Sequence, residues 1–221
     1  MSKGVIVIIC LTVFAICALV FIRIAHLVDV YRVPSMSSAP TYFPGSSFTA
    51  SSLNEPDTGK FICFRKEDKK EIWFSRCVAK SGDIVEIKDA KVYVNGRSLN
   101  EPYTWNEYYI SQKELDHIQG YVNQYNYPLQ PLHDSLYSIT FSANDEKKYQ
   151  LNLKPVIAPK GEVDSQLFAG FATLKYNRDN FGPIKIPKDD YFVLGDNRHD
   201  AFDSRYIGFI KKDEVVSTAF K

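Results

Sequence analysis

The sequence is poor in the residues that mark metal and disulfide proteins. Its 221 residues include only four cysteines and four histidines. Cys10 and Cys17 lie in an apolar N-terminal run, and Cys63 and Cys77 lack the CxxC or Cys/His spacing of zinc ligands. We therefore expect neither a metal nor a cofactor, and we interpret all four cysteines as packing residues. A Cys63–Cys77 disulfide would need an oxidising compartment, and the hairpin expected between the two places them out of register.

An excess of charge of one sign is also lacking. The 27 Lys and Arg residues against 26 Asp and Glu residues give a formal net charge of +1. This balance provides no basic face of the kind that binds a phosphate backbone, so nucleic acid is not an expected partner. No internal repeat or low-complexity tract is present. With 45% hydrophobic residues, the chain can bury the core of one domain and a subdomain.

What the sequence does have is one long apolar run at its N-terminus. Residues 5–22 contain Thr12 as their only hydroxyl, and residues 24–28 continue the run past Arg23, enough to cross about 30 Å of hydrocarbon. A cleaved signal peptide is the alternative, but the run is long for one and no small-x-small site follows it. We expect a single uncleaved span at residues 5–28. Basic residues flank both ends, so charge leaves the orientation open.

Two predicted hairpins indicate a mainly β fold with a meandering antiparallel sheet. Residues 60–65 and 72–78 are strand-like and are joined by a charged turn at residues 66–71. Residues 84–87 and 91–94, with Asn95-Gly96 after them, form the second hairpin.

The composition changes between residues 105 and 185, which are rich in Tyr, Asn and Gln. A short helix is expected at residues 111–121 and a strand at 136–141, and strong strand signal returns at 191–194. These features predict a subdomain inserted into the β fold. The expected organisation is an anchor at 1–29, a β core at 30–104 and 186–221, and an inserted subdomain at 105–185.

Three motifs carry a resemblance to a known family. Gly195-Asp196-Asn197-Arg198, followed by Asp203-Ser204-Arg205 and Gly208, closely resembles the C-terminal signature of bacterial type I signal peptidases, and we name residues 195–205 the signature loop. Residues 34–41 (PSMSSAPT) would otherwise read as a linker, but they resemble the nucleophile box of that family and are named the nucleophile segment. Arg76-Cys77-Val78-Ala79 with Gly82-Asp83 resembles the box that carries the catalytic lysine. The resemblance covers roughly residues 30–103 and 176–216, is particularly close to members from the Bacteroidetes, and implies a signal-peptidase-like antiparallel β fold.

The resemblance implies hydrolysis of a peptide bond by a serine hydroxyl with a lysine amine as general base, after a small-x-small motif. A hydroxyl is a weak nucleophile until a neighbouring base takes its proton. By the spacing of the family, three residues before Pro40, the nucleophile is Ser37 rather than Ser38. Ser35 then matches the hydroxyl that helps the Ser37 backbone N–H to bind the oxyanion.

Two residues depart from the pattern of the family. Ser75 stands at the lysine position, and Ala201 stands where a hydroxyl normally orients the lysine amine. Because a buried polar support with nothing to support is only a burial cost, the joint loss suggests that the dyad has been dismantled. The resemblance also implies a structural ion cluster of Arg76, Asp203 and Arg205.

Two other side chains are candidates for a substitute base. Lys80 lies five residues along the same strand, about 16 Å away and on the opposite face. His199 lies in the signature loop, where a surface position is the better interpretation.

Two functions remain open. One is a working signal peptidase that uses Ser37 with a substitute or water-borne base. The other, which the residues slightly favour, is a non-catalytic pseudopeptidase that holds an extended peptide at a sheet edge. A third class, the self-cleaving DNA-binding repressors with Ser–Lys chemistry, is set aside because the N-terminus is a membrane span and not a helix-turn-helix.

The partners and the location follow from the resemblance. The expected partners are signal peptides of exported preproteins, membrane lipid and other membrane or export proteins. The expected location is the bacterial inner membrane, with the C-terminal domain on the periplasmic side.

Overall fold

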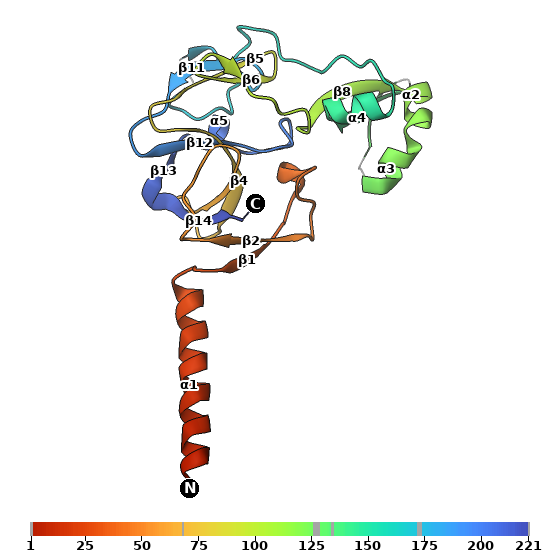
Figure 1. Cartoon of the computed structure of the whole chain (residues 1–221). Coiled ribbons are helices and arrows are strands. Elements are labelled where there is room, and N and C mark those ends of the chain that lie inside the picture. Colours follow the sequence, from red (N-terminus) through yellow and green to blue (C-terminus); the bar gives the residue numbers. More distant parts are fainter. Residues whose placement is uncertain (1, 68, 126–128, 134, 172–173, 221) are drawn as a thin grey trace.

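The chain forms a long helix that carries a β domain and a smaller helical and β subdomain at its side (Figure 1). This is a computed structural model, and it describes residues 2–67, 69–125, 129–133, 135–171 and 174–220. The expectation of a mainly β antiparallel fold with one N-terminal helix is confirmed. The expected turn at 66–71 includes residue 68, which lies outside the described residues.

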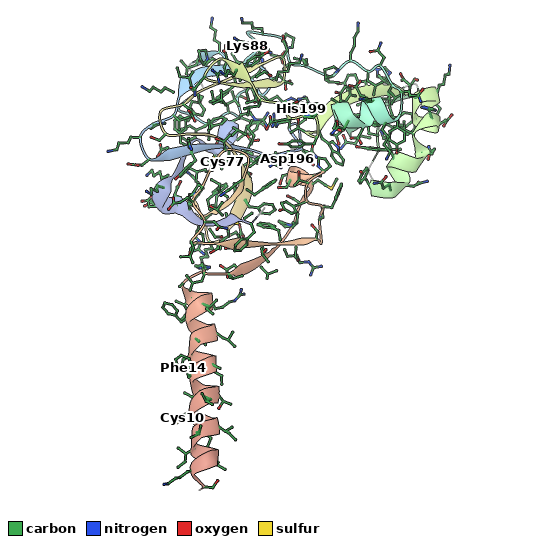
Figure 2. The ribbon with its side chains drawn as sticks, viewed as in Figure 1. Cys10, Phe14, Cys77, Lys88, Asp196 and His199 are labelled. Carbon is green, nitrogen blue, oxygen red and sulfur yellow. The ribbon has the colours of Figure 1, made fainter. Side chains whose placement is uncertain are left out.

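Helix α1 (Lys3–Ile24) is the candidate membrane span. Its 22 residues extend about 33 Å, enough for the hydrocarbon core of a bilayer. None of them is buried against the rest of the protein, and the side chains of Cys10 and Phe14 point outward from the helix (Figure 2). The helix ends four residues before the expected limit at residue 28. His26 adopts a positive φ of 51°, and the chain then turns into the first strand.

A seven-stranded antiparallel sheet forms the centre of the β domain. Its spatial order is β1-β2-β14-β3-β4-β12-β13. The strands are β1 (Asp29–Arg32), β2 (Ser47–Ser51), β14 (Val215–Ala219), β3 (Phe61–Phe64), β4 (Trp73–Lys80), β12 (Asp190–Leu194) and β13 (Ile210–Lys211). The β3–β4 pair is the first predicted hairpin. Cys63 faces Phe74 across it, so Cys63 and Cys77 are out of register, and both are free thiols. Burial raises the pKa of both thiols to about 12.

A second sheet has four strands in the order β11-β5-β6-β7. They are β11 (Phe181–Lys185), β5 (Ile84–Lys88), β6 (Lys91–Val94) and β7 (Arg97–Ser98). The β5–β6 pair is the second predicted hairpin, and Asn95 and Gly96 turn the chain into β7 with positive φ values. Because β11 pairs with β5, the expected subdomain limits of 105–185 include one strand that belongs to the β core.

The inserted subdomain has its own three-stranded sheet, in the order β8-β10-β9. It contains β8 (Asn106–Ser111), α2 (Gln112–His117), α3 (Gln119–Tyr125), β9 (Gln130–His133), β10 (Leu136–Phe141) and α4 (Ala143–Lys148). Strand β10 has the predicted bounds, whereas the single helix expected at 111–121 is two short helices. Ser111 begins α2 with a capping box to Glu114, and Ile118 ends that helix.

The core of the inserted subdomain also contains residues of the nucleophile segment. Trp105, Tyr121, Ile139 and Phe141 are fully buried there. Ala39 belongs to the same cluster, and Met36 and Phe43 pack against it. The insertion is therefore packed directly against the segment that the sequence marks as functional.

Candidate active site

The nucleophile segment forms a short 3₁₀ turn, η1 (Met36–Ser38), after Ser35. The Ser35 and Ser37 hydroxyl oxygens lie 3.0 Å apart, within hydrogen-bond distance. Ser38 is fully buried, and its hydroxyl has no hydrogen-bond partner among the described residues. Of these neighbouring serines, Ser35 and Ser37 therefore present their side chains to the cavity described next.

A cavity of about 280 Å³ lies beside Ser37. Its walls combine hydroxyl, aromatic and acidic side chains, and its lining residues are Pro34, Ser35, Ser37, Ile72, Trp73, Phe74, Ser75, Asp200 and Phe202. Ser75 is thus brought to the same cavity as Ser37. Since neighbouring residues of a strand point to opposite faces, Ser75 on β4 faces the cavity while the Arg76 guanidinium lies elsewhere.

Ala201 is close to the nucleophile segment through Gly195. A Cβ atom added at Gly195 would lie 2.2 Å from Ala201 Cβ and 2.6 Å from the Ser37 carbonyl oxygen. Position 195 therefore has no room for a side chain. Ser75 and Ala201 thus approach the nucleophile segment from the strand β4 and from the signature loop.

The signature loop is bonded to the nucleophile segment through Asn197. The Asn197 backbone N–H donates to the Ser37 carbonyl at 3.1 Å, and its side-chain amide donates to the Met36 carbonyl at 3.3 Å. These two bonds fix the main chain of Met36 and Ser37. They leave the Ser37 hydroxyl free to face the cavity.

The inserted subdomain holds the other side of the signature loop. The Trp105 N–H donates to the Asp196 carbonyl at 2.8 Å, and the Arg198 N–H donates to the Trp105 carbonyl at 2.9 Å. The Trp105 ring lies edge-on to Phe43, with centroids 5.7 Å apart. One buried residue therefore contacts both the signature loop and the chain just after the nucleophile segment. Sequence reasoning missed this role, although Trp105 stands at the predicted start of the insertion.

The expected cluster of Arg76, Asp203 and Arg205 is divided in the structure between two carboxylates. Arg76 binds Asp196, with its Nη2 2.6 Å from Asp196 Oδ2, and Thr41 also donates to this carboxylate. Arg205 binds Asp203 at 2.8 Å, and both of these side chains are almost fully buried. Burial by itself lowers the pKa of Arg205, but the Asp203 carboxylate outweighs it and the pKa is raised. The assignment of Arg76 to the Asp203 pair is corrected: Arg76 lies on the Asp196 side of the loop.

Arg198 forms a third ion pair of the signature loop. Its guanidinium binds Glu101 at 2.6 Å, and its Nε donates to the Gly195 carbonyl. Arg205 in turn donates to the Arg198 carbonyl at 2.6 Å. The loop is thus held by buried charges at several points along its length.

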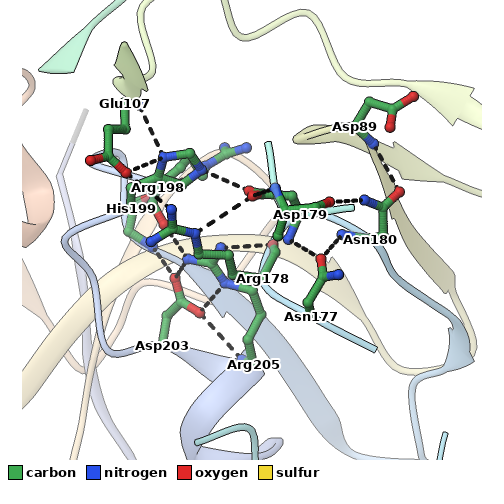
Figure 3. Close-up of polar contacts among 12 residues, drawn as sticks. Asp89, Glu107, Asn177, Arg178, Asp179, Asn180, Arg198, His199, Asp203 and Arg205 are labelled. Carbon is green, nitrogen blue, oxygen red and sulfur yellow. Dashed lines mark hydrogen bonds and ion pairs between the residues drawn. The ribbon is translucent and has the colours of Figure 1, made fainter. Parts of the chain in front are cut away.

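Neither substitute base lies at the cavity. The Lys80 ammonium pairs with Asp57 at 2.8 Å on the surface, where both side chains are about half exposed. The His199 side chain is 3% exposed, so the interpretation as a surface histidine is wrong. Its Nε2 donates to Asp179 at 2.7 Å, and its Nδ1 accepts from the Glu107 backbone N–H at 3.0 Å (Figure 3). His199 connects the loop to the inserted subdomain and does not line the cavity beside Ser37.

Asp200 is a cavity residue that sequence reasoning did not single out. It lines the cavity beside Ser37 and Ser75, and burial raises the pKa of its carboxyl. The signal available in the sequence was its position, directly before Ala201. Among the described lining residues it is the one with an ionisable side chain.

Comparison with known proteins identifies relatives along most of the chain. The family model described as "Signal peptidase, peptidase S26" matches residues 6–221. Signal peptidase I of Aquifex aeolicus is 29% identical over 224 residues, covering 93% of this chain and 78% of the relative. Signal peptidase I T of Bacillus subtilis is 25% identical over 210 residues, covering 92% of this chain and 78% of the relative. Signal peptidase IB of Staphylococcus aureus is 26% identical over 202 residues, covering 90% of this chain and 78% of the relative.

Among solved structures, the crystal structure of a signal peptidase I from Enterococcus faecalis is similar to this chain. It has a TM-score of 0.38 and 20% sequence identity. The match covers 77% of this chain and all of that chain.

Proposed function

The chain belongs to the peptidase S26 family of signal peptidases, and we propose that it handles the signal peptides of exported preproteins with cleavage activity that is weak or lost. One observation carries the proposal. The cavity beside Ser37 is lined by Ser75, and its described lining residues include no lysine, arginine or histidine. A nucleophile position is thus retained without an amine to activate it.

The chemistry of the cavity supports a low rate of peptide hydrolysis. The Ser37 hydroxyl has the Ser35 hydroxyl as its hydrogen-bond neighbour at 3.0 Å, and a hydroxyl is too weak a base to activate a nucleophile. Loss of a general base typically costs about 10²- to 10⁴-fold in rate. Sites that keep an oxyanion hole and substrate binding retain a residual rate above the uncatalysed reaction.

A second candidate is a non-catalytic subunit or peptide-binding partner in a membrane complex. The edge position of β1 supports it, because β1 pairs only with β2 among the described strands and leads directly into the nucleophile segment. An extended peptide can add to such an edge through main-chain hydrogen bonds. The apolar and aromatic walls beside Ser37 would then hold side chains of the peptide.

We further propose that α1 is a single-pass anchor with a cytoplasmic N-terminus and an extracytoplasmic C-terminal domain. The length and composition of α1 support the span, and the family supports the orientation. Protease added to spheroplasts should digest the C-terminal domain without lysis. Protection until the membrane is breached would contradict this orientation.

The central experiment uses the purified full-length protein in detergent with a labelled preprotein. Three forms are compared: the parent, Ser37→Ala and the control Ser38→Ala, which removes a buried hydroxyl outside the cavity lining. Slow cleavage that is lost only in Ser37→Ala identifies a degenerate peptidase. Preprotein binding with no cleavage in any form identifies the non-catalytic candidate. Absence of both binding and cleavage in the folded parent would overturn the proposed function.

A further inference from the structure

The cavity beside Ser37 has an acidic side chain and no basic one among its described lining residues. The lysine position is occupied by the neutral Ser75, whereas Asp200 contributes a carboxyl to the lining. The Asp200 backbone is fixed, since its N–H donates to the Asn197 carbonyl at 3.1 Å. Its carboxylate has no hydrogen-bond or ion-pair partner within the described parts of the chain.

Asp200 lines the cavity and is exposed as a residue, yet the surrounding protein partly removes water from its carboxyl and raises its pKa. A partly desolvated carboxylate without a counter-ion is less stable than one that is paired. The arginines of β4 and of the signature loop already have carboxylate partners. Arg76 is bound to Asp196, Arg198 to Glu101 and Arg205 to Asp203.

Two aromatic rings form a wall next to this carboxyl. Trp73 and Phe202 line the cavity, and they lie edge to face with centroids 6.2 Å apart. Phe202 is 57% exposed and is held in place by stacking on Tyr206 at 5.3 Å. Aromatic rings attract cations through their faces, and they also pack against the methylene groups of long side chains. A carboxylate beside exposed aromatic rings is a combination that suits a cationic side chain.

We propose that this cavity accepts a lysine or arginine side chain of a bound peptide, with the charged end at Asp200 and the methylene groups against Trp73 and Phe202. This inference rests on the proposed function, because it takes the peptide that lies along Ser37 as the source of the cation. It gives the site a preference different from the small neutral side chains that the resemblance implies.

The test measures binding of fluorescent peptides to the full-length protein in detergent. The reference peptide carries Ala-Leu-Ala at the expected cleavage position, and derivatives replace one residue at a time by Lys, Gln or Glu. At one position Lys should bind about three- to fivefold more tightly than Gln, the upper part of the range expected for an exposed ion pair. Glu at that position should bind more weakly than Gln, and added salt should reduce the advantage of Lys.

Variants of the protein assign the effect to Asp200. Asp200→Asn should bring Lys and Gln peptides to within twofold of each other, and Asp200→Lys should favour Glu peptides. The control Asp213→Asn removes one surface carboxylate in η3 (Lys212–Glu214) and should change nothing. This inference fails, while the proposed function stands, if the reference peptide binds but the Lys peptide binds no more tightly than the Gln peptide. It fails equally if the Asp200→Asn variant still binds the Lys peptide more tightly. If no peptide binds, the proposed function itself fails.

Discussion

Trp105 of the inserted subdomain forms a parallel β-bridge with Asn197 of the signature loop. The same Asn197 donates its backbone N–H to the Ser37 carbonyl, so a chain of main-chain contacts leads from the insertion to the nucleophile position. The insertion is therefore part of the scaffold of the site. Its removal would leave both the loop and the nucleophile segment without one of their supports.

Replacement of Trp105 should consequently affect both stability and peptide binding. The ring is fully buried among Phe43, Tyr121 and Tyr125. Trp105→Ala should destabilise the protein by about 3–5 kcal/mol, the usual cost of deleting a large buried ring. Trp105→Phe keeps most of the packing and should cost less. Urea unfolding of both variants gives the energies, and peptide anisotropy on the folded fraction reports the site; equal stability of the two variants would contradict the packing argument.

The ion pairs of the structure differ in burial, and their energies should differ accordingly. Asp203→Ala leaves the buried Arg205 guanidinium without its carboxylate, and we expect a loss of about 3–5 kcal/mol. Asp57→Ala breaks the exposed pair with Lys80 and should cost less than about 1 kcal/mol. Thermal midpoints of the two variants measured side by side provide the comparison. A midpoint unchanged in Asp203→Ala would mean that Arg205 finds another partner.

The Asp179–His199 contact should give part of the stability a dependence on acid pH. Burial by itself raises the pKa of Asp179, but the His199 side chain, the Ala158 backbone N–H and Arg178 together outweigh it, and the pKa is lowered from its ordinary value of 3.8. A carboxyl with a lowered folded-state pKa stabilises the fold above its unfolded pKa, and this contribution is lost as the pH falls through the folded value.

The measurement is the urea midpoint of the parent and of Asp179→Asn at a series of pH values. The parent should be the more stable of the two at pH 6, and the difference should shrink below about pH 4 as Asp179 takes up a proton. A difference that stays constant down to pH 2 would show that the charge of Asp179 contributes nothing to the contact.

The local elements of this fold were predictable because they depend on short-range patterns. The β3–β4 and β5–β6 hairpins follow from strand-like runs separated by turn residues, and β10 has the predicted bounds 136–141. The end of α1 was not predictable in the same way. The helix ends at Ile24, before the apolar run is complete, and Asp29 just beyond it binds both Arg23 and His26.

Two features of the site were not predicted, the burial of His199 and the pairing of Arg76, because both depend on contacts between segments that are distant in the sequence. His199 is buried because Asp179 and the Glu107 main chain meet it from the far side, and no pattern in the signature loop indicates either partner. Arg76 pairs with Asp196 because β4 and β12 are neighbours, with Arg76 opposite Leu194. The position of Ser75 at the cavity could be predicted, since the motif around Arg76 fixes the alignment and strand alternation fixes the face.

The most direct prediction concerns Ser75 and Ala201, the expected positions of the lysine and of its orienting hydroxyl. Ser75→Lys with Ala201→Ser should create or strongly raise signal-peptide cleavage, because the pair adds both an amine and a hydroxyl that can orient it toward Ser37. The cavity of about 280 Å³ that Ser75 and Ser37 line leaves room for the lysine stem. Its aromatic and apolar walls would lower the pKa of the amine, whereas the Asp200 carboxylate would raise it. The expected gain over the parent is about 10²-fold, at the lower end of general-base effects, since a rebuilt site rarely regains ideal geometry.

The single variants and a Ser37→Ala background show whether the two changes act as a unit. Ser75→Lys alone should gain less, because an amine without a hydrogen-bond partner samples several rotamers, and Ala201→Ser alone should gain nothing because it adds no base. The effects should therefore be non-additive. Ser37→Ala added to the double variant should abolish cleavage, whereas Ser38→Ala, which removes a buried hydroxyl, should not.

If the folded double variant cleaves no faster than the parent, then either position 75 is not the lysine position or the amine does not reach Ser37. A structure of that variant distinguishes these two cases by the distance from the new Nζ to Ser37 Oγ, which must be about 3 Å for proton transfer.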